Sequence, residues 1–185
     1  MGIGTGRQGV QPAIRNWLIP QEGIQATSTA VTEDGPGGLH KTTITVKGLN
    51  LGAIAGAANE ATGALAYTLP AGAIVVKSAY MSIGLTNTDG NIDADTPDLG
   101  IGTTVASGAV AVLSGTAAFE NILTGQTAGD VTGTATVKTV ADQILVIEAS
   151  GDHTVYLNIA DGWAGAETTG VVATGTIVLE WVLMA

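Results

Sequence analysis

The sequence predicts an all-β protein, an antiparallel sandwich or barrel, and three observations predict it. Short runs rich in Thr, Val and Ile recur along the chain, Gly, Asn, Asp or Ser residues separate most of them, and helical periodicity is nearly absent. Branched side chains suit a half-buried pleated surface. About nine short strands separated by turns are typical of an antiparallel sandwich or barrel.

The first 39 residues differ from the rest and predict an extended N-terminal arm. Residues 1–10 are Gly-rich, and residues 21–39 mix Gln, Thr, Glu, Asp, Gly and Pro. Between these two stretches lies one short apolar cluster next to Arg15, made of Ile14, Trp17, Leu18 and Ile19. The run Asp-Gly-Pro-Gly-Gly at 34–38 breaks regular structure. We therefore expect an arm over 1–39 and one β domain over 40–185.

The β domain is expected to contain strands separated by turns. We expect them at residues 42–47, 64–69, 74–85, 99–104, 109–113, 131–140, 143–149, 155–160 and 171–183. Successive side chains of a strand point to opposite faces, so alternation marks a strand with one buried face. In the last strand both faces carry apolar residues, which predicts partial cover on both, with Trp181 in the core.

One stretch predicts a helix of one or two turns. Phe119, Ile122 and Leu123 follow the spacing i, i+3, i+4, and Gly125 could end the helix. The Ala-rich residues 51–66 have helical propensity, but their glycines weaken that interpretation.

Composition excludes several classes of protein. The 185 residues fit one domain, or one domain plus an arm. Sixteen acidic and six basic residues give a net charge of −10, so we expect no nucleic-acid partner. Cysteine is absent, which removes disulfides, thiolate zinc sites and Cys nucleophiles. No apolar run reaches the roughly 18–20 residues of a membrane span, so no membrane association is expected.

No motif predicts a catalytic residue, a cofactor or a metal. The G-x-G-x-x-G pattern at 4–9 has no room for the strand that precedes it in dinucleotide folds. A G-x-S-x-G nucleophile motif is missing. We expect His40 at the surface and His153 in an exposed turn.

Two features leave alternatives open. Five Asp and Asn residues crowd residues 89–98, as in a solvated acidic loop, which we favour, or a calcium site. Trp163 follows Asp161 and Gly162 in a loop, where it is either a lid over one end of the sandwich or a contact to a partner.

The sequences of several expected strands resemble those of a known class of proteins. The stretches at 41–47 (KTTITVK), 63–72 (GALAYTLPAG), 73–81 (AIVVKSAYM) and 97–103 (PDLGIGT) resemble virion structural proteins of tailed bacteriophages. The chain is similar in style to capsid cement or decoration proteins over about residues 40–185. The resemblance implies a jelly-roll sandwich, homotrimers, and a major capsid protein as partner. It also implies a place on the outer capsid surface, reached by assembly in the host cytoplasm.

The arm is the expected contact element, because a capsid-binding protein needs a segment that becomes ordered on a neighbour. The expected contact residues are Arg7, Arg15, Trp17, Leu18 and Ile19. Two other functions remain open: a phage fibre or receptor-binding module, and a coat protein with a single jelly roll. An enzyme is not expected.

Overall fold

The computed structural model describes residues 23–35, 38–115, 118–140 and 144–184, which form eleven β-strands joined by turns and loops, and no helix. The strands are β1 (Ile24–Gln25), β2 (Thr29–Asp34), β3 (Leu39–Asn50), β4 (Asn59–Thr68), β5 (Ala73–Thr86), β6 (Asp98–Gly102), β7 (Leu123–Thr127), β8 (Thr136–Val140), β9 (Leu145–Ile147), β10 (Thr154–Gly162) and β11 (Val172–Met184).

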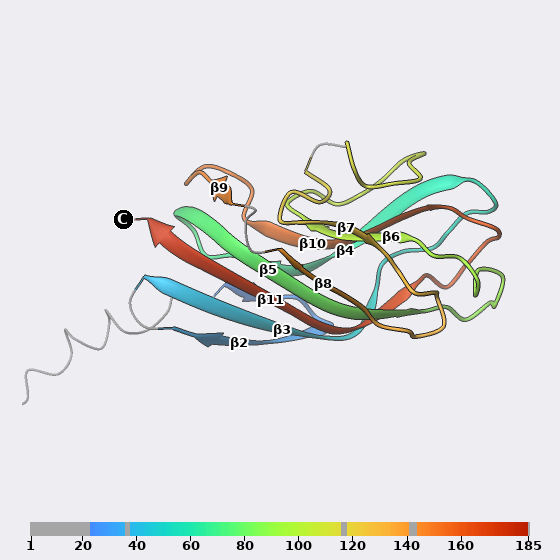
Figure 1. The fold of residues 1–185 in the computed structure, drawn as a ribbon, viewed down its shortest axis with the longest axis horizontal. Coiled ribbons are helices and arrows are strands. Elements are labelled where there is room, and N and C mark those ends of the chain that lie inside the picture. The colour runs from blue at the N-terminus through green and yellow to red at the C-terminus, as the bar shows by residue number, and fades with distance from the viewer. Residues whose placement is uncertain (1–22, 36–37, 116–117, 141–143, 185) are drawn as a thin grey trace, which may run out of the picture.

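The strands form two antiparallel sheets that pack face to face as a β-sandwich (Figure 1). One sheet has the order β1-β4-β10-β6-β7, and the other has the order β2-β3-β11-β5-β8, with β9 also paired to β5. Four pairs are nested along the chain: β3 with β11, β4 with β10, β5 with β8, and β6 with β7. The antiparallel sandwich expected from the sequence is confirmed.

The long central strands follow the alternation of their side chains. In β3, His40, Thr42, Ile44 and Val46 are buried, while most residues between them are exposed. In β11, Ile177, Leu179 and Trp181 point into the core, and the outward Val178 and Val182 are half-buried. The last strand is therefore partly covered on both faces, as its sequence predicted.

The core places Trp181 against β3. Its side chain is fully buried, and its Nε1 donates a hydrogen bond to Thr42 Oγ1 at 2.8 Å. The ring of His40 stacks on the indole, with a centroid distance of 4.0 Å and an interplanar angle of 6°. His40 is only 4% exposed, so the expectation of a surface histidine is wrong. Stacking on a flat aromatic ring buries an imidazole favourably, and spacing alone did not reveal this neighbour.

The expected helix at 119–125 is absent, and β7 begins at Leu123 instead. One or two turns make too few hydrogen bonds to offset helix nucleation, whereas pairing with β6 extends an existing sheet. A side chain at Gly102 would collide with the backbone of Ala118 and Phe119, so this loop lies directly against β6.

Residues 109–113 also form a loop rather than a strand. This loop buries Leu113 while Val112 stays exposed. Leu113 joins Phe119 and three alanines in a small second core, which explains the apolar residues there without a strand.

Part of the expected arm belongs to the sandwich. Residues 24–34 form β1 and β2, and β2 pairs with β3 from Thr29 opposite Val46 to Asp34 opposite Lys41. Residues 1–22 lie outside the described residues, and so do all five expected contact residues. These are Arg7, Arg15, Trp17, Leu18 and Ile19.

Candidate interaction surface

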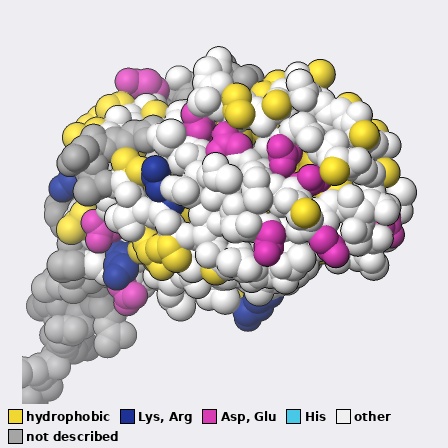
Figure 2. Space-filling view, turned by 45° about the vertical axis from the view of Figure 1, so that its right-hand side comes forward, with side chains coloured by type: hydrophobic (Ala, Val, Ile, Leu, Met, Phe, Trp, Pro, Cys, Tyr) yellow, Lys and Arg dark blue, Asp and Glu magenta, His cyan; other side chains and the backbone are white. Residues whose placement is uncertain are grey.

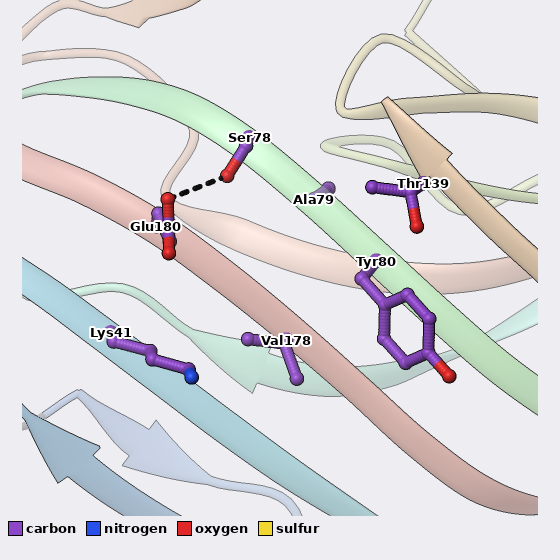
Figure 3. Close-up of a pocket in the computed structure, with 7 residues that line it drawn as sticks. All are labelled: Lys41, Ser78, Ala79, Tyr80, Thr139, Val178 and Glu180. Atoms are coloured by element: carbon purple, nitrogen blue, oxygen red, sulfur yellow. Dashed lines mark hydrogen bonds between the residues drawn. The ribbon is translucent and has the colours of Figure 1, made fainter. Parts of the chain in front are cut away.

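The outer face of the sheet that contains β3, β11 and β5 is an extended surface of ordered rows. Strand register sets Asp34 opposite Lys41, Lys41 opposite Glu180, and Glu180 opposite Ser78. The signs of the charges therefore alternate across the strands. Glu180 Oε2 also accepts a hydrogen bond from Ser78 Oγ at 2.9 Å (Figure 3). This row is called the charged row below.

A shallow hollow of about 300 Å³ lies beside the charged row. Seven residues line it, namely Lys41, Ser78, Ala79, Tyr80, Thr139, Val178 and Glu180. Figure 3 shows these side chains spread over β3, β11, β5 and β8, with the Tyr80 ring near Val178. One amine, one carboxylate, two hydroxyl groups and a phenol can exchange hydrogen bonds with a polar partner, and Tyr is enriched at protein interfaces.

A second row crosses the same face at the end of the sheet. Leu39 lies opposite Val182, Val182 opposite Val75, and Val75 opposite Val146. Leu39 and Val146 are exposed, at 45% and 49%, and the two inner valines are half-buried. This set of four is called the apolar row below.

The acidic stretch at 89–98 is an internal brace of the loops at one end of the sandwich. Asp89 Oδ2 accepts hydrogen bonds from the Thr168 amide and hydroxyl, both at 2.9 Å. Asp93 Oδ1 accepts from Asn87 Nδ2 at 2.8 Å. Asp95 Oδ2 accepts from the Ala164 amide at 2.9 Å. In the part of the chain that the structure describes, no group of three or more His, Cys, Asp or Glu side chains could hold a metal ion. The carboxylates of this stretch therefore accept hydrogen bonds that hold neighbouring loops together.

Glu167 is the buried centre of the same loops, and no sequence pattern indicated this role. Its side chain is fully buried. Oε2 accepts from the amides of Thr88 and Asp89 at 2.9 and 2.8 Å, and Oε1 accepts from the amide and hydroxyl of Thr169 at 3.0 and 2.5 Å. Burial alone would raise the pKa of this carboxyl group. The four hydrogen bonds outweigh burial and lower the pKa to about 2, so the carboxylate is charged at neutral pH.

The side chains of Trp163 and His153, which the sequence singled out, bond to the backbone of neighbouring segments. Trp163 is buried at 2% exposure, and its Nε1 donates to the Glu60 carbonyl oxygen at 2.9 Å, as expected of a lid residue. The ring of His153 is half-buried and shares a hydrogen bond of 2.7 Å with the Gly72 carbonyl oxygen through Nε2. The expectation of an exposed turn residue is therefore only partly met.

The face seen in Figure 2 carries scattered Asp and Glu side chains and fewer Lys. Residues 40–185 contain 13 acidic and four basic residues, so this part of the chain is acidic. Such a surface favours basic segments of a partner.

Comparisons of the chain with protein-family models, curated proteins and solved structures find no match. Among the described residues, no helix is long and apolar enough to cross a membrane.

Proposed function

We propose that this protein is a structural component of a tailed-bacteriophage virion. It binds the outer capsid surface and stabilises the head by bridging capsomers. The observation that carries the proposal is the outer face of the β3-β11-β5 sheet, where the charged row borders a shallow hollow lined by hydroxyl and phenol groups. A small-molecule site encloses most of its ligand, whereas this open face with a shallow hollow fits a protein partner.

Two further features support this proposal. The four nested strand pairs fit the jelly-roll type that the sequence resemblance implies. Arg7 and Arg15 both fall in the arm, whereas the 40–185 region is acidic. The arm therefore offers a capsid partner positive charges, whereas residues 40–185 offer mainly negative charges.

The partners in this proposal are the major capsid protein and other copies of the same chain, as homotrimers. Each copy makes weak contacts, and repetition over a lattice converts weak contacts into high avidity. The chain carries no catalytic role in this proposal. Its place is the capsid surface, after assembly in the host cytoplasm.

Binding to phage heads tests the proposal. Heads are assembled from the major capsid protein of the same genome and sedimented with increasing amounts of the full chain. We expect saturable co-sedimentation and a higher disruption temperature for decorated heads. Saturation without any gain in head stability would contradict a cementing role, and a chain that stays in the supernatant would contradict capsid binding.

A variant that lacks residues 1–22 tests the arm. The cut must stop before Gly23, because β1 and β2 belong to the sandwich. We expect this variant to keep the near-ultraviolet circular dichroism of its buried tryptophans and to lose head binding. Full-strength binding by a folded truncated chain would contradict a role for the arm.

Experiments on the same purified chain also test the two alternative functions. A receptor-binding module should adsorb to host cells and present exposed aromatic residues at loop tips. Trp163, the expected aromatic of that kind, is buried. A coat protein should assemble into closed shells on its own, which electron microscopy of the purified chain detects.

A further inference from the structure

Exposed large apolar side chains gather at one end of the sandwich. Seven are exposed among the described residues, and four of them belong to this end. These four are Leu39 at 45%, Ile144 at 65%, Val146 at 49% and Met184 at 44% exposure. Figure 2 shows hydrophobic side chains beside Lys toward the left of the molecule. Contiguous exposed apolar surface marks an interaction site more often than scattered single residues do.

The strand register joins these residues into a stripe. The apolar row crosses β3, β11, β5 and β9, and its three inter-strand gaps of about 4.8 Å give a length of about 14 Å. Met184 pairs with Ala73 just beyond it, and Ile144 directly precedes β9. The charged row runs parallel to the stripe on the same outer face, two residues nearer the middle of the sheet. It contributes the carboxylates of Asp34 and Glu180.

The first described residue lies near this end. The Gly23 amide donates to the Tyr67 hydroxyl oxygen at 2.7 Å, and that hydroxyl donates to Glu33 Oε1 at 2.6 Å. Glu33 lies opposite Thr42, which is three residues from Leu39 in β3, a distance of about 10 Å along the strand. Gly23 therefore lies at the same end of the sandwich as the apolar row, at the edge where β1 of one sheet and β2 of the other lie side by side.

The arm contains one segment that matches the apolar row in chemistry and length. Residues 14–19 carry Ile14, Trp17, Leu18 and Ile19, and they end four residues before Gly23. Four residues reach about 13 Å, and the six residues of the segment span up to about 20 Å, enough for the 14 Å stripe. Within the segment, Arg15 matches the two carboxylates of the charged row.

We propose that residues 14–19 bind the apolar row of their own chain. A short tether gives an effective concentration in the millimolar range, which favours the chain's own segment over that of another copy. The interaction concerns the free protein and does not depend on capsid binding.

Limited trypsin digestion of the full chain tests the proposal. Arg7 and Arg15 are the only arginines, and the four lysines lie in strands β3, β5 and β8. Cleavage after Arg15 reports access to the segment, and cleavage after Arg7 is the internal control outside it. We expect the Arg15 site to be cut at least about tenfold more slowly, since cleavage follows the population of the open state.

A matched pair of variants assigns the protection to the apolar row. Val146→Asp places a charge in the row and should bring cleavage after Arg15 close to the rate after Arg7. Val137→Asp is the control, because Val137 is 58% exposed on the same face but lies opposite Ser82, outside the row. It should leave the protection unchanged. Leu39→Asp should repeat the effect of Val146→Asp from the other end of the row, and thermal melts of all variants establish that each is folded.

Three results would overturn the proposal. The first is equal cleavage at both arginines of the unaltered chain. The second is the same loss of protection in folded Val146→Asp and Val137→Asp. The third is protection that rises with protein concentration, since this would assign the apolar row to a second copy rather than to the chain's own segment.

Discussion

Replacing Glu167 by Gln should destabilise the protein far more than a typical carboxylate substitution. The side-chain oxygen of Gln can still accept the hydrogen bonds from the backbone N–H groups of Thr88 and Asp89. In that orientation the new NH₂ group points toward Thr169. The Thr169 hydroxyl can rotate to accept from this group, but the Thr169 amide loses its acceptor in a part-buried site. An unsatisfied donor there costs about 1 kcal/mol, at the lower end of the range for buried groups, and loss of the charge weakens the three remaining bonds by about 0.5–1 kcal/mol each. We expect a total of about 3 kcal/mol.

Urea denaturation followed by tryptophan fluorescence measures this effect, because Trp163 and Trp181 are buried reporters of the folded state. With a slope of about 2 kcal/mol per molar urea, the midpoint should fall by about 1.5 M. Glu180→Gln is the matched control, since Glu180 is exposed and accepts one hydrogen bond from Ser78. It should change stability by less than about 0.5 kcal/mol. Equal midpoints for the two variants would refute the reasoning.

The effect of Glu167→Gln should also depend on pH in a defined direction. The pKa of Glu167 is about 2 in the folded chain and has an ordinary value of 4.5. Its stabilising effect is therefore complete above pH 4.5 and is lost as the pH falls toward 2. The stability difference between the unaltered chain and Glu167→Gln should shrink over that interval. A difference that stays constant from pH 6 to pH 2.5 would show that the hydrogen bonds do not favour the charged form.

Two further substitutions test the backbone and the edge of the sandwich by the same urea denaturation. Gly175→Ala should cost about 3 kcal/mol, because Gly175 has φ of 149° and an added Cβ would collide with the Ser82 carbonyl oxygen. Gly56→Ala, which meets nothing within 4 Å, should be nearly neutral, and equal costs would contradict the argument. Tyr67→Phe removes the hydroxyl that joins Gly23 to Glu33 and should cost about 1–3 kcal/mol, whereas an unchanged midpoint would show that this link contributes nothing.

Three strands rich in apolar residues could be predicted from the sequence almost to the residue. The expected strands at 74–85, 155–160 and 171–183 correspond to β5, β10 and β11 within one or two residues at each end. In these strands, local side-chain pattern and burial in the core agree. The pattern of buried and exposed faces follows from a period of two, which is visible without any knowledge of partners.

Elements that depend on distant neighbours could not be predicted in this way. The strand β2 is short and mostly polar, and its pairing with β3 defines it. Leu113 and Phe119 are apolar because they fill a small second core, so the segments that contain them imitate a strand and a helix. Glu167 has an ordinary sequence context, and its four hydrogen bonds come from residues up to 79 positions away.

The apolar row illustrates the same limit for the interaction surface. Its four residues come from four strands, and the sequence distance from Leu39 to Val182 hides their alignment. A strand shifted by one residue would turn its member of the row into the core. The apolar segment of the arm, in contrast, was visible as a sequence cluster, because its residues are adjacent in the chain.

The two proposals for the arm make one joint prediction about capsid binding. A segment that is docked on its own chain is free to bind a capsid only for the fraction of time that it is released, and the apparent dissociation constant rises by the inverse of that fraction. Protection of about tenfold in the trypsin experiment corresponds to about one tenth released. Val146→Asp releases the segment, so it should bind heads up to about tenfold more tightly than the unaltered chain, while Val137→Asp should not differ. Weaker binding by Val146→Asp would show instead that the apolar row itself contacts the capsid, and the arm would then compete with the head for the same surface.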